Sequence, residues 1–139
     1  SDLGKRHRIS EEGGFGFEVG LGLLLDTHFP HHSLDAYGVA LEALVKADAL
    51  AKKPLSGYGP LSDQLRRASQ STFLQLSEGV ARSGADRAQR LRGARAEACE
   101  AAACVEALGR LGLATEAEMA ELLSLLGRLA AMLTKLSGR

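Results

Sequence analysis

Four runs of apolar residues at helical spacing lie between residue 34 and the end of the chain at residue 139, and they constrain the fold more than any other feature. In each run, apolar residues recur at intervals of three or four, which is the spacing of one face of an α-helix. Turn residues separate the runs, at Pro54 to Pro60, Ser83–Gly84 and Gly109 to Gly112. Four helices with such short connections favour an antiparallel up-down-up-down bundle. We therefore predict an all-α four-helix bundle.

Local signals give the expected ends of the first two helices. Ser33 is a suitable N-cap, so the first helix should begin there and run to about Lys53. The second helix should start near Leu61 or Ser62 and end at Gly79. The positions that carry the helical spacing are Leu34, Tyr37, Leu41, Leu44 and Ala47 in the first helix, and Leu65, Ala68, Thr72, Leu76 and Val80 in the second.

The last two helices have clearer ends. The third fits residues 85–111, and Gly109 and Gly112 supply a C-terminal stop. Its seam, in which many alanines permit close packing, is Ala88, Leu91, Ala94, Ala98, Ala101, Val105 and Leu108. The fourth helix begins with a capping box at Thr115-Glu116-Ala117-Glu118. Its stripe, wide enough to face both the core and a neighbouring subunit, is Leu122, Leu125, Leu126, Leu129, Met132, Leu133 and Leu136.

Composition excludes several other classes of protein. Aromatic residues make up only 4% of the chain, which disfavours β-sandwiches and barrels. No run approaches the roughly 18 apolar residues of a membrane span, so we expect no membrane association and a cytoplasmic location. Cys99 and Cys104 are five residues apart, which turns them about 140° from each other on a helix. We expect two free thiols, buried or half-buried, as in a reducing compartment.

Residues 1–33 differ from the rest of the chain. They hold six of the 16 glycines, three of the four phenylalanines and all four histidines, and they show no helical period. We therefore predict an irregular Gly-rich N-terminal extension over 1–33, followed by the bundle over 34–137. The glycines, together with Phe15, Phe17 and Val19, fit an extended arm laid against another surface, and disorder is the alternative interpretation.

Charge is segregated along the chain although the net charge is zero. Residues 66–95 carry seven arginines against Glu78 and Asp86, a net charge of +5, while residues 97–121 carry six glutamates against Arg110, a net charge of −5. Arginine suits phosphate because its planar fork donates two parallel hydrogen bonds. The candidate contacts to an RNA or DNA backbone are Arg66, Arg67, Arg82, Arg87, Arg90 and Arg95. The alternatives are a solvated helix face or contacts between basic and acidic segments of neighbouring subunits.

Catalytic and metal-binding side chains are sparse in this sequence. The bundle has no histidine to serve as a base for a serine nucleophile, so we predict no catalytic residues, no enzyme activity and no cofactor. We predict no metal site, and the only candidate ligands are the histidines around Pro30, namely His28, His31 and His32. The alternative interpretation of these histidines is a mobile or crystal-contact segment.

The stretch from Leu61 to Gly79, LSDQLRRASQSTFLQLSEG, resembles a bacterial four-helix-bundle family named after proteins encoded in intervening sequences of 23S ribosomal RNA genes. That family carries L-x-x-Q-x-R-R-A-x-x-S followed by N-I-A-E-G. Here Gln75 replaces the asparagine and Ser77 the alanine, whereas Glu78 and Gly79 remain. The resemblance extends over residues 34–137, including Leu108 to Gly112 at the end of the third helix.

This resemblance implies a homo-oligomer, commonly a pentameric ring with a central channel. One branch of the family serves as the accessory protein of diversity-generating retroelements and contacts a reverse transcriptase and nucleic acid. We therefore expect a non-enzymatic homo-oligomeric, pentameric adaptor that presents a charged surface to a macromolecular partner, RNA, DNA or protein. The alternative is a nucleic-acid-binding accessory protein that contacts the RNA or DNA backbone.

Overall fold

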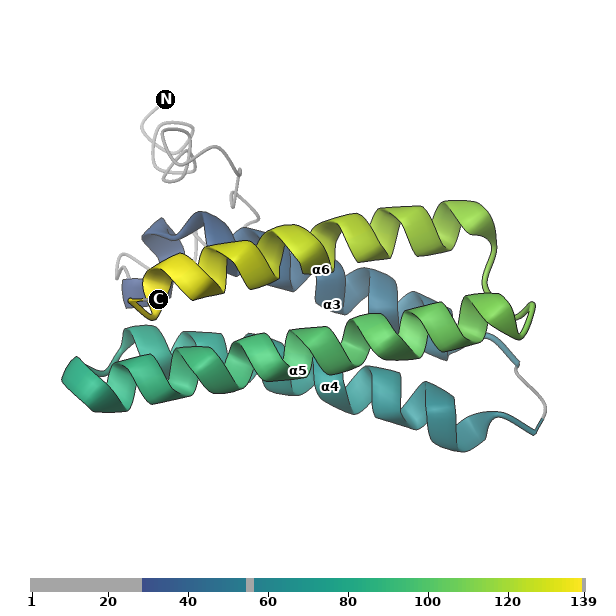
Figure 1. Ribbon diagram of the computed structural model, residues 1–139, viewed down its shortest axis with the longest axis horizontal. Helices are drawn as coiled ribbons and strands as arrows, with labels where there is room; N and C mark the ends of the chain where they lie inside the picture. Colours follow the sequence, from purple (N-terminus) through teal and green to yellow (C-terminus); the bar gives the residue numbers. More distant parts are fainter. Residues whose placement is uncertain (1–28, 55–56, 139) are drawn as a thin grey trace, which may run out of the picture.

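The computed structural model describes residues 29–54 and 57–138, and it consists of helices packed side by side (Figure 1). In chain order, the elements are the 3-10 helix η1 (Pro30–Ser33) and the α-helices α3 (Asp35–Ala51), α4 (Gly59–Val80), α5 (Gly84–Arg110) and α6 (Glu116–Leu136).

The four α-helices form an antiparallel bundle. Helix α3 packs against α4 and α6, and α5 packs against the same two helices. Consecutive helices run in opposite directions because their connections are short (Figure 1). This arrangement confirms the predicted all-α four-helix fold. The boundary between the extension and the bundle stays a prediction, since residues 1–28 lie outside the described residues.

The core combines leucines with many alanines. The predicted seam of α5 is buried throughout, apart from the half-buried Ala88. The predicted positions of α4 are all buried as well. In α6, Met132 and Leu136 are half-buried against this core, and the stripe therefore packs within the chain's own bundle. The buried members of that stripe are Leu122, Leu125, Leu126, Leu129 and Leu133.

The buried face of α3 matches the prediction only in part. Tyr37 and Ala47 are buried as predicted. Leu41 and Leu44 are only half-buried, because they lie on the flank of α3 that carries Asp48, the partner of Arg66 of α4, and not on the face toward the bundle axis. Small side chains face the axis of the bundle instead and allow close packing. These axis-facing residues are Ala36, Val39, Ala40, Ala43, Ala47 and Leu50.

The first two helices begin at residues other than the predicted ones. The N-cap of α3 is Leu34, not Ser33, because Ser33 ends the preceding 3-10 helix η1. Helix α4 begins at Gly59, before the predicted Leu61, because Pro60 occupies its first turn. A proline is tolerated there, since the amide that it lacks has no partner within the helix.

The glycines at the end of α5 have different roles. Gly112 has a positive φ of 78°, and its amide donates to the Gly109 carbonyl while the Leu113 amide donates to the Leu108 carbonyl. This is a Schellman C-cap, so the predicted stop at Gly112 is confirmed. Gly109 lies inside the helix, where a Cβ would collide with Met119 of α6. Its role is close packing rather than termination.

The two cysteines occupy different environments. Both are free thiols, as predicted, but Cys99 is exposed rather than buried or half-buried. Burial raises the pKa of the Cys104 thiol, and the nearby Glu100 carboxylate adds to this effect. The difference follows from their spacing, because five residues turn them to different sides of α5.

Candidate functional site

The six predicted arginines do not form one surface. Arg66 lies on the flank of α4 that faces α3, where its Nε is 3.5 Å from Asp48 Oδ1. Asp63 is a second partner, 4.0 Å from Arg66 Nη1. Arg95 lies on another side of the molecule. It precedes Ala102 by seven residues and Gly109 by 14, so the three residues share one side of α5. Gly109 lies against Met119, and this side therefore faces α6. Arg66 and Arg95 therefore cannot bind the same short stretch of a ligand.

Three further arginines are engaged at the turn between α4 and α5. Arg82 Nη1 donates to Asp86 Oδ2 at 2.8 Å, and Arg90 Nη1 lies 3.5 Å from Glu78 Oε1. The half-buried Arg87 donates to the Val80 carbonyl at 3.2 Å, which ties the start of α5 to the end of α4. These side chains stabilise the turn, and acidic partners offset two of their charges.

Arg67 and Arg95 are the candidates that remain available. Both are exposed, and neither has an ion pair among the described residues. Arg92, which lies among the candidates in sequence, is also exposed and unpaired there. Arg67 is on α4, whereas Arg92 and Arg95 are three residues apart on α5 and so lie on neighbouring parts of one helical surface.

The antiparallel packing of α5 and α6 brings like charges together. Because Gly109 lies beside Met119, residues near the start of α5 lie beside residues near the end of α6. We call residues 84–96 of α5 and 122–136 of α6 the basic half of this layer. It has one acidic residue, Asp86, and its basic residues are Arg87, Arg90, Arg92, Arg95, Arg128 and Lys135.

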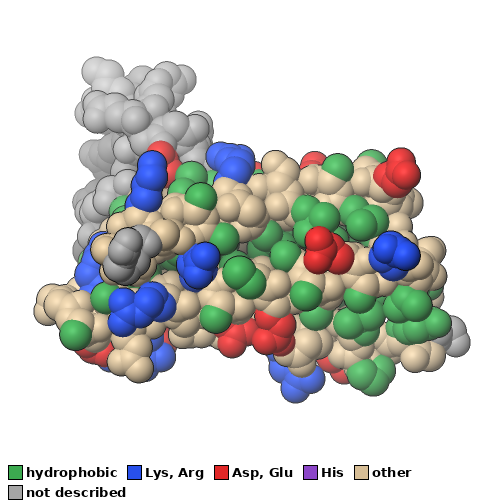
Figure 2. Space-filling view, viewed as in Figure 1, with side chains coloured by type: hydrophobic (Ala, Val, Ile, Leu, Met, Phe, Trp, Pro, Cys, Tyr) green, Lys and Arg blue, Asp and Glu red, His purple; other side chains and the backbone are tan. Residues whose placement is uncertain are grey.

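Two residues of the basic half were missed by the sequence analysis. Arg128 and Lys135 are exposed, have no ion pair among the described residues, and lie far from the arginine-rich segment in sequence. The sequence shows that no acidic residue follows Glu121. This absence indicates a basic surface only once the packing of α6 beside α5 is known. Figure 2 shows Lys and Arg side chains gathered mainly over the end of this face where α5 begins and α6 ends.

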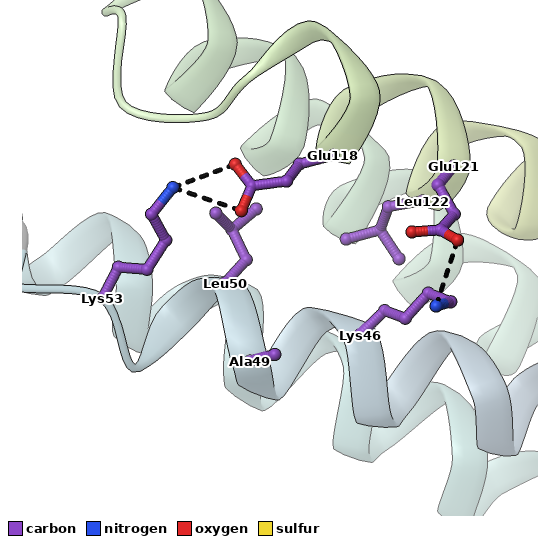
Figure 3. A pocket seen from close by; sticks show the side chains of 7 residues that line it. All are labelled: Lys46, Ala49, Leu50, Lys53, Glu118, Glu121 and Leu122. Atoms are coloured by element: carbon purple, nitrogen blue, oxygen red, sulfur yellow. Dashed lines mark hydrogen bonds and ion pairs between the residues drawn. The ribbon is translucent and has the colours of Figure 1, made fainter.

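The other end of the layer is acidic and is partly neutralised within the chain. We call residues 97–110 of α5 and 116–121 of α6 the acidic half, which carries six glutamates against Arg110. Lys46 of α3 and Lys53, two residues after its end, pair with two of these glutamates. Lys53 Nζ donates to Glu118 Oε1 at 2.9 Å, and Lys46 Nζ is 3.1 Å from Glu121 Oε2 (Figure 3).

These two ion pairs border a hollow of about 260 Å³ between α3 and α6. Figure 3 shows Lys46 of α3 and Lys53, just after α3, reaching toward Glu121 and Glu118 of α6, with apolar side chains between the pairs. The Thr115 amide and the Lys53 ammonium both donate to Glu118 and hold its pKa below the ordinary value. The hydrogen bonds that lower this pKa also fix the start of α6 and tie it to the segment that follows α3.

The substitution of Gln75 for the family's asparagine is accommodated between α4 and α5. The Gln75 side chain lies directly against Gly93 of α5, where the space depends on the missing Cβ, and its Nε2 donates to Ser71 Oγ at 3.0 Å. The surrounding hollow of about 380 Å³ includes Arg90 and Asp86, which already have partners. Gln75 therefore packs between these helices, and its hydrogen bond to Ser71 lies within α4.

The metal prediction is not tested by the described residues. His28 lies outside them, and among the three candidate histidines only the ring of His31 is described. That ring stacks on Phe29 and contacts Tyr37. In the part of the chain that the structure describes, no three His, Cys, Asp or Glu side chains are grouped to hold a metal.

None of the described helices is long and apolar enough to span a membrane.

These features define an antiparallel all-α bundle with a charge-polarised helix layer. Residues 33–135 match the family model described as 23S rRNA-intervening sequence protein. The chain belongs to this family, so the expected relationship is confirmed. No curated protein matches the chain.

Proposed function

We propose that this protein is a non-enzymatic, homo-oligomeric assembly or adaptor protein that presents the basic half of its α5–α6 layer to a macromolecular partner. The proposal rests on four basic side chains of this half that are exposed and have no acidic partner among the described residues. They are Arg92, Arg95, Arg128 and Lys135. An unpaired cationic surface of this kind is suited to an anionic partner.

The contrast with the acidic half supports this choice of surface. Lys46 of α3 and Lys53, just after it, compensate Glu121 and Glu118, so part of the acidic charge is neutralised within the chain. This pairing disfavours the alternative in which those two glutamates attract arginines of a neighbouring subunit. The family is not known as one of enzymes, which also supports a binding or assembly role.

The homo-oligomeric part of the proposal rests on the family, and its pentameric form on the resemblance of the sequence. In a cyclic oligomer, each copy repeats the same charged surface around the ring. The fields of these surfaces add at short range, so a ring of basic halves attracts a long polyanion more strongly than one copy does. A central channel is part of the same expectation.

Nucleic-acid binding is the second candidate function, and Arg92 and Arg95 favour it. Their spacing allows both guanidinium groups to contact successive phosphates. Among the described aromatic side chains, Phe29, Tyr37 and Phe73 form ring contacts at the α3–α4 side and Tyr58 immediately precedes α4, so none belongs to the basic half. We therefore expect binding to the phosphate backbone rather than stacking of single-stranded bases.

A charge-reversal series tests the basic half directly. We expect a fluorescently labelled 20-nucleotide RNA to bind the wild type, with an affinity that falls as salt rises. The variant Arg92→Glu/Arg95→Glu/Arg128→Glu should lose at least about tenfold in affinity, because each removed phosphate contact lowers the electrostatic attraction. Anisotropy titrations at two salt concentrations measure both effects.

Arg110→Glu is the matched control, because Arg110 is an equally exposed arginine without an ion pair but lies in the acidic half. It should leave the affinity nearly unchanged. Equal losses in the triple variant and the control would overturn the assignment of the basic half. An absence of RNA and DNA binding at low salt would remove the nucleic-acid candidate and leave a protein partner for the adaptor.

A further inference from the structure

The α3–α4 side of the bundle carries an apolar surface that the described helices do not cover. Val45 of α3 and Leu74 of α4 are 62% and 55% exposed, the highest values among the exposed large hydrophobic residues described. Leu41 and Phe73 are half-buried beside the core of the same two helices. We call Leu41, Val45, Phe73 and Leu74 the α3–α4 apolar face.

Two contacts between the helices place these residues on one side of the bundle. Leu41 follows Tyr37 by one turn of α3, and the Tyr37 ring lies 5.4 Å from the Phe73 ring of α4, measured between centroids. At the other end, the ion pair of Asp48 and Arg66 connects the same flanks of α3 and α4. The apolar face therefore lies between an aromatic contact and a polar border.

The described chain begins at the aromatic end of this face. The Phe29 and His31 rings are stacked with centroids 5.8 Å apart, and the His31 ring lies 4.4 Å from that of Tyr37. Together with the contact of Tyr37 and Phe73, these rings form a continuous series from the first described residue to α4. The series fixes where the preceding part of the chain joins the bundle.

The preceding part of the chain contains an apolar segment at short range. Residues 19–25 read VGLGLLL, with five large aliphatic residues, two glycines and no charge. Three residues, 26–28, separate this segment from Phe29. Three extended residues span about 10 Å, close to the distance of about 8–10 Å between packed helices. The segment is thus joined by a short connection to Phe29, at the aromatic end of the α3–α4 apolar face.

We propose that residues 19–25 of this chain dock on the α3–α4 apolar face of the same bundle and cover Val45 and Leu74. Removal of both apolar surfaces from water drives the contact. Gly20 and Gly22 have no Cβ, so the backbone of the segment can approach the helices closely. This docking gives the predicted N-terminal arm a defined surface, and it does not depend on the basic half or on the number of subunits.

Hydrogen exchange of the full chain tests this docking. Amides of residues 19–25 should exchange at least about tenfold faster in Val45→Ser/Leu74→Ser than in the wild type, because local opening then exposes less apolar surface. Leu111→Ser is the matched control, since Leu111 is 48% exposed but lies after α5, at the other end of the bundle. The control should leave exchange of residues 19–25 unchanged.

Thermal unfolding of each variant shows whether the bundle stays folded. If the double variant is unfolded, the exchange of residues 19–25 is measured in the single variant Leu74→Ser instead. Equal exchange rates in the wild type and in a folded variant would overturn the proposal. Slow exchange that is lost on dilution, together with a fall in mass by light scattering, would assign the face to a second copy and also overturn docking within one chain.

Discussion

Gly79, in the motif shared with the family, has a packing role that the structure makes explicit. A Cβ at this position would lie 2.9 Å from Leu91 Cδ2 and 3.1 Å from the Cβ of Arg90. Leu91 is fully buried, and the Cβ of Arg90 is fixed by its backbone, so neither neighbour can move away easily. The glycine thus sets the close approach of α4 and α5 near their shared turn.

We predict that Gly79→Ala destabilises the bundle by about 1 kcal/mol. Overpacking costs about 1–3 kcal/mol, and the better helix propensity of alanine returns about 1 kcal/mol. Gly127→Ala is the control, because no atom lies within 4 Å of its added Cβ, and it should stabilise by about 0.5–1 kcal/mol. Urea unfolding measures both changes, and a stabilising Gly79→Ala would contradict this role of Gly79.

At the scale of elements, the start of α6 shows how a local motif serves tertiary structure. The Glu118 amide donates to Thr115 Oγ1 at 3.1 Å and the Thr115 amide donates to Glu118 Oε1 at 2.8 Å, which confirms the predicted capping box. The same carboxylate accepts from Lys53, two residues after the end of α3. Glu118 therefore fixes the start of its own helix and the docking of α6 on α3.

The stabilisation from Glu118 should depend on pH. The hydrogen bond from the Thr115 amide and the Lys53 ammonium lower the pKa of Glu118 below its ordinary value of 4.5. The stabilisation is thus present above about pH 4.5 and is lost as the pH falls through the lowered pKa. We expect Glu118→Gln to cost about 0.5–1 kcal/mol at pH 7, within the range of exposed caps and ion pairs.

Thermal unfolding at pH 7, 5 and 3 should show the difference between Glu118→Gln and the wild type disappear at the lowest pH. Glu106→Gln is the control, because Glu106 is exposed and has no hydrogen bond or ion pair among the described residues. A difference of the same size at pH 7 and pH 3 would contradict a role for the ionised carboxylate.

Element ends with local signals could be predicted from the sequence, whereas the faces of α3 could not. Thr115 and Gly112 act through hydrogen bonds to residues within a few positions, so their roles are visible in sequence. The helical spacing through Leu41 and Leu44 placed the larger side chains on the buried face. In the bundle, Tyr37 and Ala47 are buried as predicted, but Ala40 and Ala43 take the place of Leu41 and Leu44, because short helix–helix distances favour small side chains.

At the scale of the whole molecule, the basic residues that lie together in the fold differ from those that lie together in the sequence. The sequence shows a basic segment followed by an acidic one, which predicts that Arg66 to Arg95 act together. In the fold, Arg66 and Arg95 lie on different sides, and Arg128 and Lys135 of α6 join Arg95 in the basic half. These two could not be assigned from sequence, because their proximity to α5 depends on how α5 and α6 pack rather than on local spacing.

Native mass spectrometry of the full chain, with and without a 20-nucleotide RNA, tests the central claim of a homo-oligomer with a basic surface most directly. We predict a single assembly of five copies of the 14.7-kDa chain, which gains the mass of RNA when RNA is added. In Arg92→Glu/Arg95→Glu/Arg128→Glu the assembly should persist while the RNA mass is lost. A monomer at every concentration would contradict the assembly, and an unchanged RNA mass in the triple variant would contradict the basic half as its binding surface.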